Sequence, residues 1–325
     1  MAAGRGMNRY ARQMVLPEVG AAGQDRILAA HVLIVGAGGL GVPALQYLAG
    51  AGIGQITLID ADTVAESNLH RQPIYGMADI GQPKVQAAAQ AVARLDPAVA
   101  VTPLQARLTP ANAPELVRAA DLVLDCADSY AASYTLSDAC LALGRPLISA
   151  SALGLSGYVG GFCGGAPSLR AVFPDAPDSG QTCATAGVLG PVVGMLGAMQ
   201  AQMALGVILG IAPSPLGQMT RLDHGRLTQF RFDTAPETPG PRFIALDQIR
   251  DSDLVIDLRP DTEAPQTATP DALRIPGYGD TGPLPADGQR VVLACRSGLR
   301  SWRAADRLAR RWPGEITLLA MGEPE

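Results

Sequence analysis

A glycine-rich turn followed by an acidic residue is the pattern nearest the start of the chain that could do chemistry. The turn runs from Gly36 to Gly41 and has glycine at four positions, Gly36, Gly38, Gly39 and Gly41. Glycine lets the backbone approach a phosphate closely and adopt dihedral angles that a Cβ disfavours. Asp60 lies 19 residues after Gly41, where a carboxylate can accept hydrogen bonds from the two hydroxyls of a ribose. The pattern predicts a nucleotide site in preference to a purely structural turn, and it fits any adenosine cofactor.

Two basic residues that follow this turn separate the candidate nucleotides. Arg71 lies in the segment Ser67-Asn68-Leu69-His70-Arg71-Gln72, and Lys84 begins a helix predicted over residues 84–95. The diphosphate of NAD is largely neutralised by a helix N-terminus and backbone amides. A triphosphate that releases pyrophosphate needs arginine, lysine and usually a metal ion. The two cations therefore favour ATP over NAD.

A carboxylate at the end of another predicted strand offers a metal ligand. Residues 121–128 read as a buried strand that ends in Asp128. Open parallel sheets gather their ligands at the carboxyl ends of strands, and Mg²⁺ prefers oxygen ligands. The alternative is that Asp128 only caps a helix starting near Ser129. With Arg71 and Lys84 in the same chain, the magnesium interpretation is favoured.

The elements that must position these residues alternate between strand and helix. Residues 31–35 and 55–59 are short apolar runs of strand length, and residues 42–51 between them read as a helix. This alternation predicts an α/β fold with a Rossmann-like, doubly wound, mainly parallel sheet.

A second region with its own chemistry follows a proline-rich linker, residues 233–241. Two further buried strands are predicted at residues 254–259 and 290–294, and the second leads into Cys295-Arg296-Ser297-Gly298-Leu299-Arg300-Ser301 and an amphipathic helix from Trp302 to Arg311. A cysteine that enters a helix through a short loop gathers backbone amides around its sulfur, which stabilises a thiolate or persulfide. We therefore expect a domain at residues 8–232 and a small α/β domain at residues 242–325.

The five cysteines argue against a disulfide scaffold and a zinc site. They are Cys126, Cys140, Cys163, Cys183 and Cys295, and no two form a C-x-x-C pair. Cys183 differs from the others because it lies in a glycine-rich stretch just before a long apolar segment. A thiol near a helix N-terminus has a lowered pKa, which suits a nucleophile. The alternative is an ordinary small core residue.

Taken together, these motifs resemble the MoeB/ThiF/HesA family, bacterial relatives of ubiquitin-activating enzymes. The resemblance runs in order from about Arg9 to Leu222, and it also rests on Arg9-Tyr10-Ala11-Arg12-Gln13 and Gly81-Gln82-Pro83-Lys84. It implies ATP-dependent adenylation of the C-terminal glycine of a ubiquitin-like sulfur carrier protein ending in Gly-Gly. The two alternatives from other functional classes are an NAD-dependent oxidoreductase and a non-catalytic carrier-binding protein.

The resemblance also assigns roles to residues. Asp60 would hold the ribose, Asn68, Arg71 and Lys84 the phosphates, and Asp128 the magnesium. The other implied nucleotide contacts are Ser67, Leu69, His70 and Ser129, the last replacing the asparagine usual in the family. Arg12 resembles the arginine that reaches into the partner subunit's site, which implies a homodimer; otherwise it is an exposed arginine in a mobile arm. Cys183 resembles the loop cysteine that accepts the acyl group or exchanges persulfide sulfur. Many relatives carry two C-x-x-C zinc pairs that are absent here, so no zinc is expected.

Residues 295–301 resemble the active loop of a rhodanese. Cys295 would then carry a sulfane sulfur received from a cysteine desulfurase or another persulfide donor. The family's usual His-x-Pro-Gly-Ala is Arg274-Ile275-Pro276-Gly277-Tyr278 here, so a domain that no longer turns over is one alternative. A loop holding phosphate or arsenate is another. The expected product is a carrier thiocarboxylate for thiamine thiazole or molybdopterin synthesis, with a preference for thiamine.

Composition limits the partners and the location. A net charge of -5 and a pI near 5.3 argue against nucleic acid, which calls for a basic face. The segment from Met1 to Tyr10 lacks an apolar signal core, which predicts a cytoplasmic protein. Residues 186–211 are apolar enough to span a membrane by length, but glycine, proline and glutamine interrupt them and no polybasic flank follows. We expect a buried helix there and no membrane partner.

Overall fold

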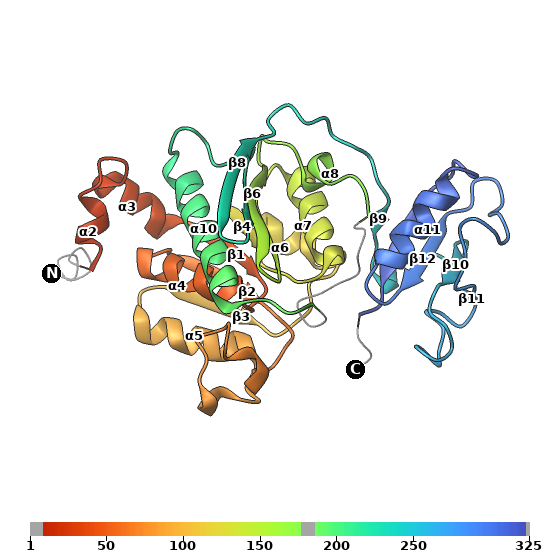
Figure 1. Ribbon diagram of the computed structural model, residues 1–325, viewed down its shortest axis with the longest axis horizontal. Helices are drawn as coiled ribbons and strands as arrows, with labels where there is room; N and C mark the ends of the chain where they lie inside the picture. Colours follow the sequence, from red (N-terminus) through yellow and green to blue (C-terminus); the bar gives the residue numbers. More distant parts are fainter. Residues whose placement is uncertain (1–8, 177–185, 323–325) are drawn as a thin grey trace.

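The structure is a computed structural model that describes residues 9–176 and 186–322. Two sheets are built from consecutive parts of this chain, and Figure 1 shows them at either side of a junction that involves α7 (Tyr130–Leu143) and α11 (Leu299–Ala309). The larger sheet uses residues 31–231, and the smaller one residues 242–320.

The larger sheet has eight strands in the order β3-β2-β1-β4-β5-β6-β7-β8. The first five are parallel: β1 (His31–Val35), β2 (Gln55–Ile59), β3 (Ala100–Leu104), β4 (Leu122–Asp125) and β5 (Pro146–Leu153). The last three are antiparallel: β6 (Ser156–Cys163), β7 (Gln218–Asp223) and β8 (Arg226–Arg231). The chain winds from β1 to β3 in one direction and from β4 to β8 in the other. The carboxyl ends of β1 and β4 therefore form the switch point at which such sheets bind ligands.

Helices cover both faces of this sheet because its central strands are apolar on both sides. In β1, Val32 and Ile34 join the apolar cluster on one face, and Leu33 and Val35 join the cluster on the other. The first face is covered by α3 (Gly20–Ala29), α4 (Gly41–Ala51), α5 (Lys84–Leu95) and α10 (Gly190–Leu209). The second is covered by α6 (Ala113–Ala119), α7 and α8 (Leu169–Val172). The doubly wound, mainly parallel fold is confirmed.

The apolar segment near residue 200 forms one helix of the core. α10 is long and apolar enough to cross a membrane by length and composition, but it packs against α4, β5 and β6. Half of the tested window is buried, and Gly197 lies so close to Leu40 and Pro43 that a Cβ would collide with both. These contacts fit the buried-helix interpretation.

The smaller sheet has five parallel strands in the order β11-β10-β12-β13-β9. They are β9 (Arg242–Phe243), β10 (Leu254–Asp257), β11 (Leu273–Arg274), β12 (Val291–Cys295) and β13 (Ile316–Ala320). The boundaries of these elements differ from the sequence prediction by up to three residues. β10 ends at Asp257 instead of residue 259, and α11 begins at Leu299 instead of residue 302, because Gly298 adopts a φ of +87° and turns the chain directly into the helix.

Candidate active site

In the glycine turn after β1, three of the four glycines have no room for a Cβ, and the fourth faces open space. Gly36 has a φ of +101°, and a Cβ there would lie 2.5 Å from the carbonyl oxygen of Cys126. A Cβ on Gly41 would overlap the carbonyl of Gly36, and one on Gly39 would lie 2.9 Å from Val193. Gly38 faces open space, with only Gln72 Nε2 within reach at 3.8 Å. Of the four glycines, Gly38 is therefore the one that leaves room for a phosphate.

Asp60 stands beside this turn at the carboxyl end of β2. Its Oδ2 accepts a hydrogen bond from the backbone N–H of Ala37 at 2.7 Å, and its Oδ1 accepts one from Asp62 at 2.8 Å. Burial raises the pKa of this carboxyl, and the nearby Lys84 partly offsets the effect. The carboxylate is thus fixed against the turn, where a ribose would lie next to it.

The two predicted phosphate-binding cations differ in how they are held. The Lys84 side chain is nearly buried at the start of α5, and its Nζ lies 2.7 Å from Asp62 Oδ2. The Arg71 guanidinium donates to the carbonyl of Ser67 at 2.9 Å and lies 2.8 Å from His70 Nε2. Lys84 is therefore already held in place near Asp60. The Arg71 side chain instead contacts its own segment, and it must change rotamer to bind a phosphate.

The backbone of the segment around Arg71 is held in place by contacts with neighbouring residues. Asn68 Oδ1 accepts from the N–H of Ala65 at 3.0 Å, within a short 3-10 turn, Glu66–Asn68. Leu69 packs on the core, while Ser67 and His70 are exposed. The carbonyl of His70 lies against Gly190, so the N-terminus of α10 borders the segment. The structure thereby brings residues 67–71 to the same edge as Gly38 and Asp60.

Two residues at this edge were missed by the sequence prediction. Gln72 is buried, and its Oε1 has no hydrogen-bond partner among the described residues, although the side chain faces Gly38. The Tyr75 hydroxyl donates to the carbonyl of Ala37 at 2.9 Å and so supports the glycine turn. A buried acceptor without a donor costs free energy, which indicates a site that a bound ligand would complete. The only signal in the sequence was that both residues follow Arg71 closely.

Asp128 lies exposed just past β4, with Ser129 as the N-cap of α7. The N-cap position of α7 is held by Ser129, so the structure does not support the helix-cap alternative for Asp128. Within residues 9–176 and 186–322, no group of three or more His, Cys, Asp or Glu side chains is arranged to hold a metal. A single carboxylate still fits a Mg²⁺ ion whose other ligands are phosphate oxygens and water.

A buried polar network lies underneath the Asp128 loop. The Asp125 carboxylate accepts from Ser149 Oγ at 2.7 Å and from the N–H of Ala127 at 3.2 Å. Gln200 of α10 donates to the carbonyls of Asp125 and Ile148 at 2.8 and 3.2 Å. The network ties β4, β5 and α10 together directly below the loop that carries Asp128.

Burial raises the pKa of Asp125 to about 6. An unfolded aspartate titrates near pH 4, so the folded chain holds the proton more tightly, and this contribution to stability is lost as the pH rises through about 6. Relative to an Asp125→Asn variant, the wild-type free energy of unfolding should fall by roughly 2–3 kcal/mol between pH 4 and pH 7. Urea denaturation at several pH values measures this difference. Asp223→Asn, at an exposed carboxyl whose pKa is lowered by His224, should show no such fall. A constant difference for Asp125→Asn would contradict the assignment.

Arg12 is not brought to this edge. Arg12 is exposed in the short helix α2 (Ala11–Met14), and the adjacent Gln13 bonds to the carbonyl of Ala51 at the C-terminus of α4. The glycine turn meets the opposite end of α4, about 16 Å away for a helix of this length. Arg12 therefore lies near the end of α4 that is remote from the glycine turn of its own chain. Cys183 lies outside the described residues.

Cys295 ends β12 with its sulfur in a cradle of backbone amides. The Sγ accepts hydrogen bonds from Gly298 N at 3.2 Å and Ser301 N at 3.3 Å. Arg300 pairs with Glu263 and donates to the carbonyl of Leu258 at 3.3 Å, which fixes the start of the helix beside β10. The two amides point at the buried sulfur, an arrangement that suits a thiolate or persulfide.

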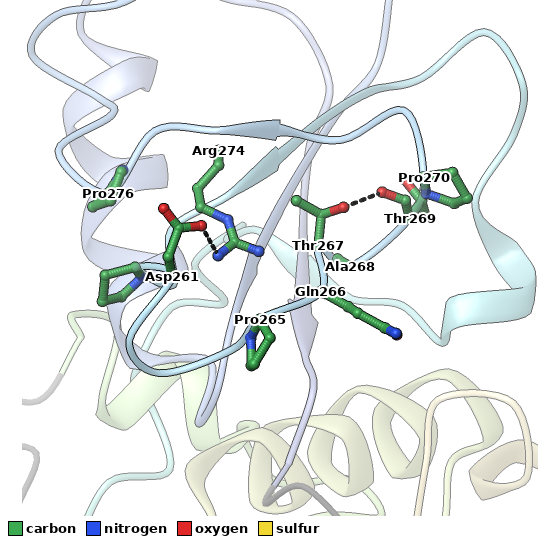
Figure 2. Close-up of a pocket in the computed structure, with 10 residues that line it drawn as sticks. Asp261, Pro265, Gln266, Thr267, Ala268, Thr269, Pro270, Arg274 and Pro276 are labelled. Atoms are coloured by element: carbon green, nitrogen blue, oxygen red, sulfur yellow. Dashed lines mark hydrogen bonds and ion pairs between the residues drawn. The ribbon is translucent and has the colours of Figure 1, made fainter.

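A hollow of about 790 Å³ lies in the connection between β10 and β11 (Figure 2). It is lined by Pro260, Asp261, Pro265, Gln266, Thr267, Ala268, Thr269, Pro270, Arg274 and Pro276. Arg274, at the position of the rhodanese histidine, points to Asp261, and its guanidinium also donates to the carbonyl of Ala264 at 2.6 Å. Arg274 is thus engaged by a carboxylate and a carbonyl within the hollow.

The edge that holds the glycine turn, Asp60 and Lys84 agrees with a family comparison. The ThiF family model matches residues 10–240. The chain belongs to the ThiF family. The resemblance of residues 9–222 to the MoeB/ThiF/HesA family is thereby confirmed.

Curated relatives support this membership over part of their length. The chain is 49% identical over 220 residues to the adenylyltransferase and sulfurtransferase MOCS3 of Bos taurus, covering 67% of this chain and 48% of the relative. It is 48% identical over 206 residues to the adenylyltransferase and sulfurtransferase UBA4 of Yarrowia lipolytica, covering 62% and 52%. The chain thus spans about half the length of the curated relatives it matches.

Solved structures agree on the fold of this ThiF-family chain. The crystal structure of PaaA superposes with a TM-score of 0.61 at 22% identity, covering 70% of this chain and 84% of PaaA. The crystal structure of E. coli MccB with ATP superposes with a TM-score of 0.59 at 20% identity, covering 70% and 72%. At these identities the likeness supports the architecture alone.

Proposed function

We propose that this chain adenylates the C-terminal glycine of a ubiquitin-like sulfur carrier protein and then replaces AMP by sulfur carried on Cys295. The observation that carries the proposal is the cluster of Asp60 and Lys84 beside the open Gly38, at the switch point of a ThiF-family sheet. The relatives named adenylyltransferase and sulfurtransferase support the same pair of activities. The four described cysteines are free, and a reducing cytoplasm suits a thiol that carries a persulfide.

The residues of the edge would share the work of the first step. Asp60 would accept the ribose hydroxyls, while Lys84 and a rotated Arg71 would meet the phosphates and Asp128 would hold Mg²⁺. When bound, the ion would neutralise charge on the phosphate oxygens. The carrier carboxylate attacks the α-phosphate, pyrophosphate leaves, and an acyl-adenylate forms. No residue has to transfer a proton in this step.

The second step would place sulfur on the activated glycine. The terminal sulfur of a Cys295 persulfide attacks the acyl carbon and displaces AMP, which forms an acyl disulfide between Cys295 and the carrier. A thiol reductant then attacks the Cys295 sulfur of that bond. The carrier leaves as a thiocarboxylate, and Cys295 remains in a disulfide with the reductant, which a second thiol opens. A cysteine desulfurase or another persulfide donor reloads the thiolate.

Carrier-dependent exchange of pyrophosphate into ATP tests the first step. Purified protein is assayed with ThiS-like and MoaD-like carriers side by side, with a carrier lacking the terminal Gly-Gly as the control. We expect exchange with at least one intact carrier and none with the truncated one. Absence of exchange with every intact carrier would favour a non-catalytic carrier-binding protein, and binding of NAD in preference to ATP would favour the oxidoreductase. The carrier that supports exchange identifies the thiamine or the molybdopterin pathway.

The position of Arg12 is best explained by a homodimer. A hollow of about 550 Å³ between α4 and α10 is lined mostly by small and apolar side chains, among them Tyr47, Ala198 and Leu205, and it adjoins Gln13 next to Arg12. Tyr47 is 62% exposed on this face. A second copy bound there would cover the hollow. Each Arg12 would then lie next to the partner chain and could extend toward the partner's site.

We therefore expect Tyr47→Glu to turn a dimer into a monomer and to lower pyrophosphate exchange by about tenfold, because a charge is placed in the interface and each site loses the partner's arginine. Light scattering and the exchange assay measure the two effects. Leu141→Glu, at an exposed position on α7, is the matched control and should change neither. A dimer that survives Tyr47→Glu would place the interface elsewhere.

A further inference from the structure

The carboxyl edges of the two sheets lie against each other within one chain. Gly298 of the Cys295 loop packs on α7, where a Cβ on Gly298 would lie 3.5 Å from Ala131 Cβ. Gly322, just after β13, lies against the Arg107 guanidinium, which follows β3. Gly322 in turn donates to the carbonyl of Arg296, next to Cys295, at 2.9 Å. Two separate contacts therefore hold the Cys295 loop against the edge that carries the proposed nucleotide site.

These contacts set a short path between the two reactive centres. Cys295 Sγ accepts from Gly298 N, Gly298 touches Ala131, and Ala131 is three residues after Asp128. Three residues of chain span at most about 11 Å. A carrier whose C-terminal carboxylate lies at Asp128 is therefore close to the loop that holds the buried Cys295.

One buried arginine holds this arrangement together. Arg170 donates to both Asp138 oxygens at 2.7 and 3.0 Å and to the carbonyl of Pro241 in the linker at 3.0 Å. Its guanidinium also lies 4.9 Å from the ring centre of Tyr134 on α7 and 5.3 Å from that of Trp302 on α11. The residue is 6% exposed and contacts the first sheet's helix, the linker and the second sheet's helix at once.

Neighbouring contacts make the junction a packed interface. Tyr134 and Trp302 meet edge to face with ring centres 4.5 Å apart. Glu237 of the linker accepts from both the N–H and the hydroxyl of Ser168, at 2.7 and 2.6 Å. One apolar cluster runs continuously from the larger sheet into the smaller one. Aromatic pairs and charge-assisted hydrogen bonds of this kind hold two parts in one orientation.

We infer that Cys295 delivers sulfur to the nucleotide site of its own chain, and that Arg170 is the positioning residue that holds it there. The inference rests on the proposed function. It adds that transfer occurs within one chain and not between the two chains of a dimer, and that it depends on a fixed junction. Fixing two groups at a short separation raises the effective concentration of the persulfide at the acyl-adenylate.

Mixing two inactive variants separates transfer within a chain from transfer between chains. Lys84→Met keeps Cys295 but removes the phosphate lysine, and Cys295→Ser keeps the nucleotide site but removes the sulfur carrier. The variants are unfolded together and refolded as a mixture so that mixed dimers form, and thiocarboxylate is followed by mass spectrometry. We expect background yield, whereas a quarter or more of the wild-type rate would overturn the inference, since it would mean that Cys295 serves the partner's site. Wild type refolded with Lys84→Met is the control. Its thiocarboxylate yield should fall only in proportion to the fraction of Lys84→Met chains in the mixture.

Arg170→Met tests the positioning role, because two partial reactions, pyrophosphate exchange and persulfide loading, are compared with complete thiocarboxylate formation. Pyrophosphate exchange and persulfide loading of Cys295 should each stay within about twofold of wild type, while thiocarboxylate formation falls at least about tenfold. Added sulfide, which attacks the acyl-adenylate directly and releases AMP, should restore the thiocarboxylate. A merely structural role would lower all three measurements together and would not respond to sulfide.

Two further variants keep this test decisive. Arg145→Met, at an arginine that bonds only to the carbonyl of Arg118 among the contacts described, is the matched control and should be unaffected. If Arg170→Met does not fold, Asp138→Asn removes the carboxylate partner alone and should give the same split. Thiocarboxylate formation that stays within about twofold of wild type in a folded variant overturns the role of Arg170. Loss of exchange in the wild type itself would instead refute the proposed function.

Discussion

Replacing Lys84 by methionine is expected to lower carrier-dependent pyrophosphate exchange by about 100- to 1,000-fold, the range found when one preorganised charge-stabilising donor is removed. The ammonium group is nearly buried and is held by Asp62 beside Asp60, the proposed ribose ligand. Such a group costs no reorganisation when charge moves onto the phosphate oxygens. Methionine preserves the length and apolar stem of the side chain, so the loss should appear in the rate and not in the fold.

The sequence offers an unusually clean check, because Lys84 is its only lysine. An amine-reactive acylating reagent can therefore modify only this side chain and the terminal amine. ATP should protect Lys84 from acylation, as measured by peptide mass spectrometry, whereas NAD should not. Arg94→Met, in the last turn of the same helix, is the matched control and should leave exchange within about twofold. Unchanged exchange in Lys84→Met would remove the lysine from the mechanism.

Replacing Cys295 by serine is expected to abolish thiocarboxylate formation, by at least about a thousandfold, while pyrophosphate exchange stays unchanged. A hydroxyl cannot carry a sulfane sulfur, and the amides of Gly298 and Ser301 are arranged around a sulfur atom. The variant therefore separates the two steps completely. The two yields are measured on the same preparation with a persulfide donor.

Cys140→Ala is the matched control for this experiment. Burial raises the pKa of the Cys140 thiol well above its usual value, so it stays protonated and is a poor nucleophile. We expect its removal to leave sulfur transfer unchanged in the protein that folds. Full thiocarboxylate yield in Cys295→Ser would assign the sulfur relay to another residue, and Cys183 would be tested next.

The residues at the nucleotide edge show how far the sequence could be interpreted. Spacing along the chain was enough to predict that Gly38, Asp60 and Lys84 lie at one edge of the sheet. Each follows a predicted strand or begins a predicted helix, and parallel strands bring their carboxyl ends to one edge. Spacing did not distinguish Gly38 from Gly39 and Gly41, whose lack of a Cβ is explained by Val193 and by the turn's own backbone. The contact with Val193 joins residues more than 150 positions apart in the chain, and no local pattern encodes it.

The same limit applies to residues whose role depends on burial. Gln72 is an ordinary polar residue by sequence, and its unpartnered oxygen beside Gly38 emerges only from the packed structure. Asp125 is one of 30 acidic residues, and its raised pKa follows from its burial against β5 and α10. Burial of this kind is set by which elements pack together, so composition and periodicity do not predict it.

By itself the sequence determined the classes of element, their order, the family, and the two loops to which we assign phosphate and sulfur chemistry in the proposed function. These features are local: they depend on hydrophobic period, glycine at tight turns and the covalent spacing of a few residues. Only the tertiary structure decided that Arg12 lies at the far end of α4 from its own nucleotide edge, and that Arg170 fastens the Cys295 loop beside α7. Both facts depend on contacts between residues distant in the chain, and the packing of the folded chain as a whole fixes those contacts.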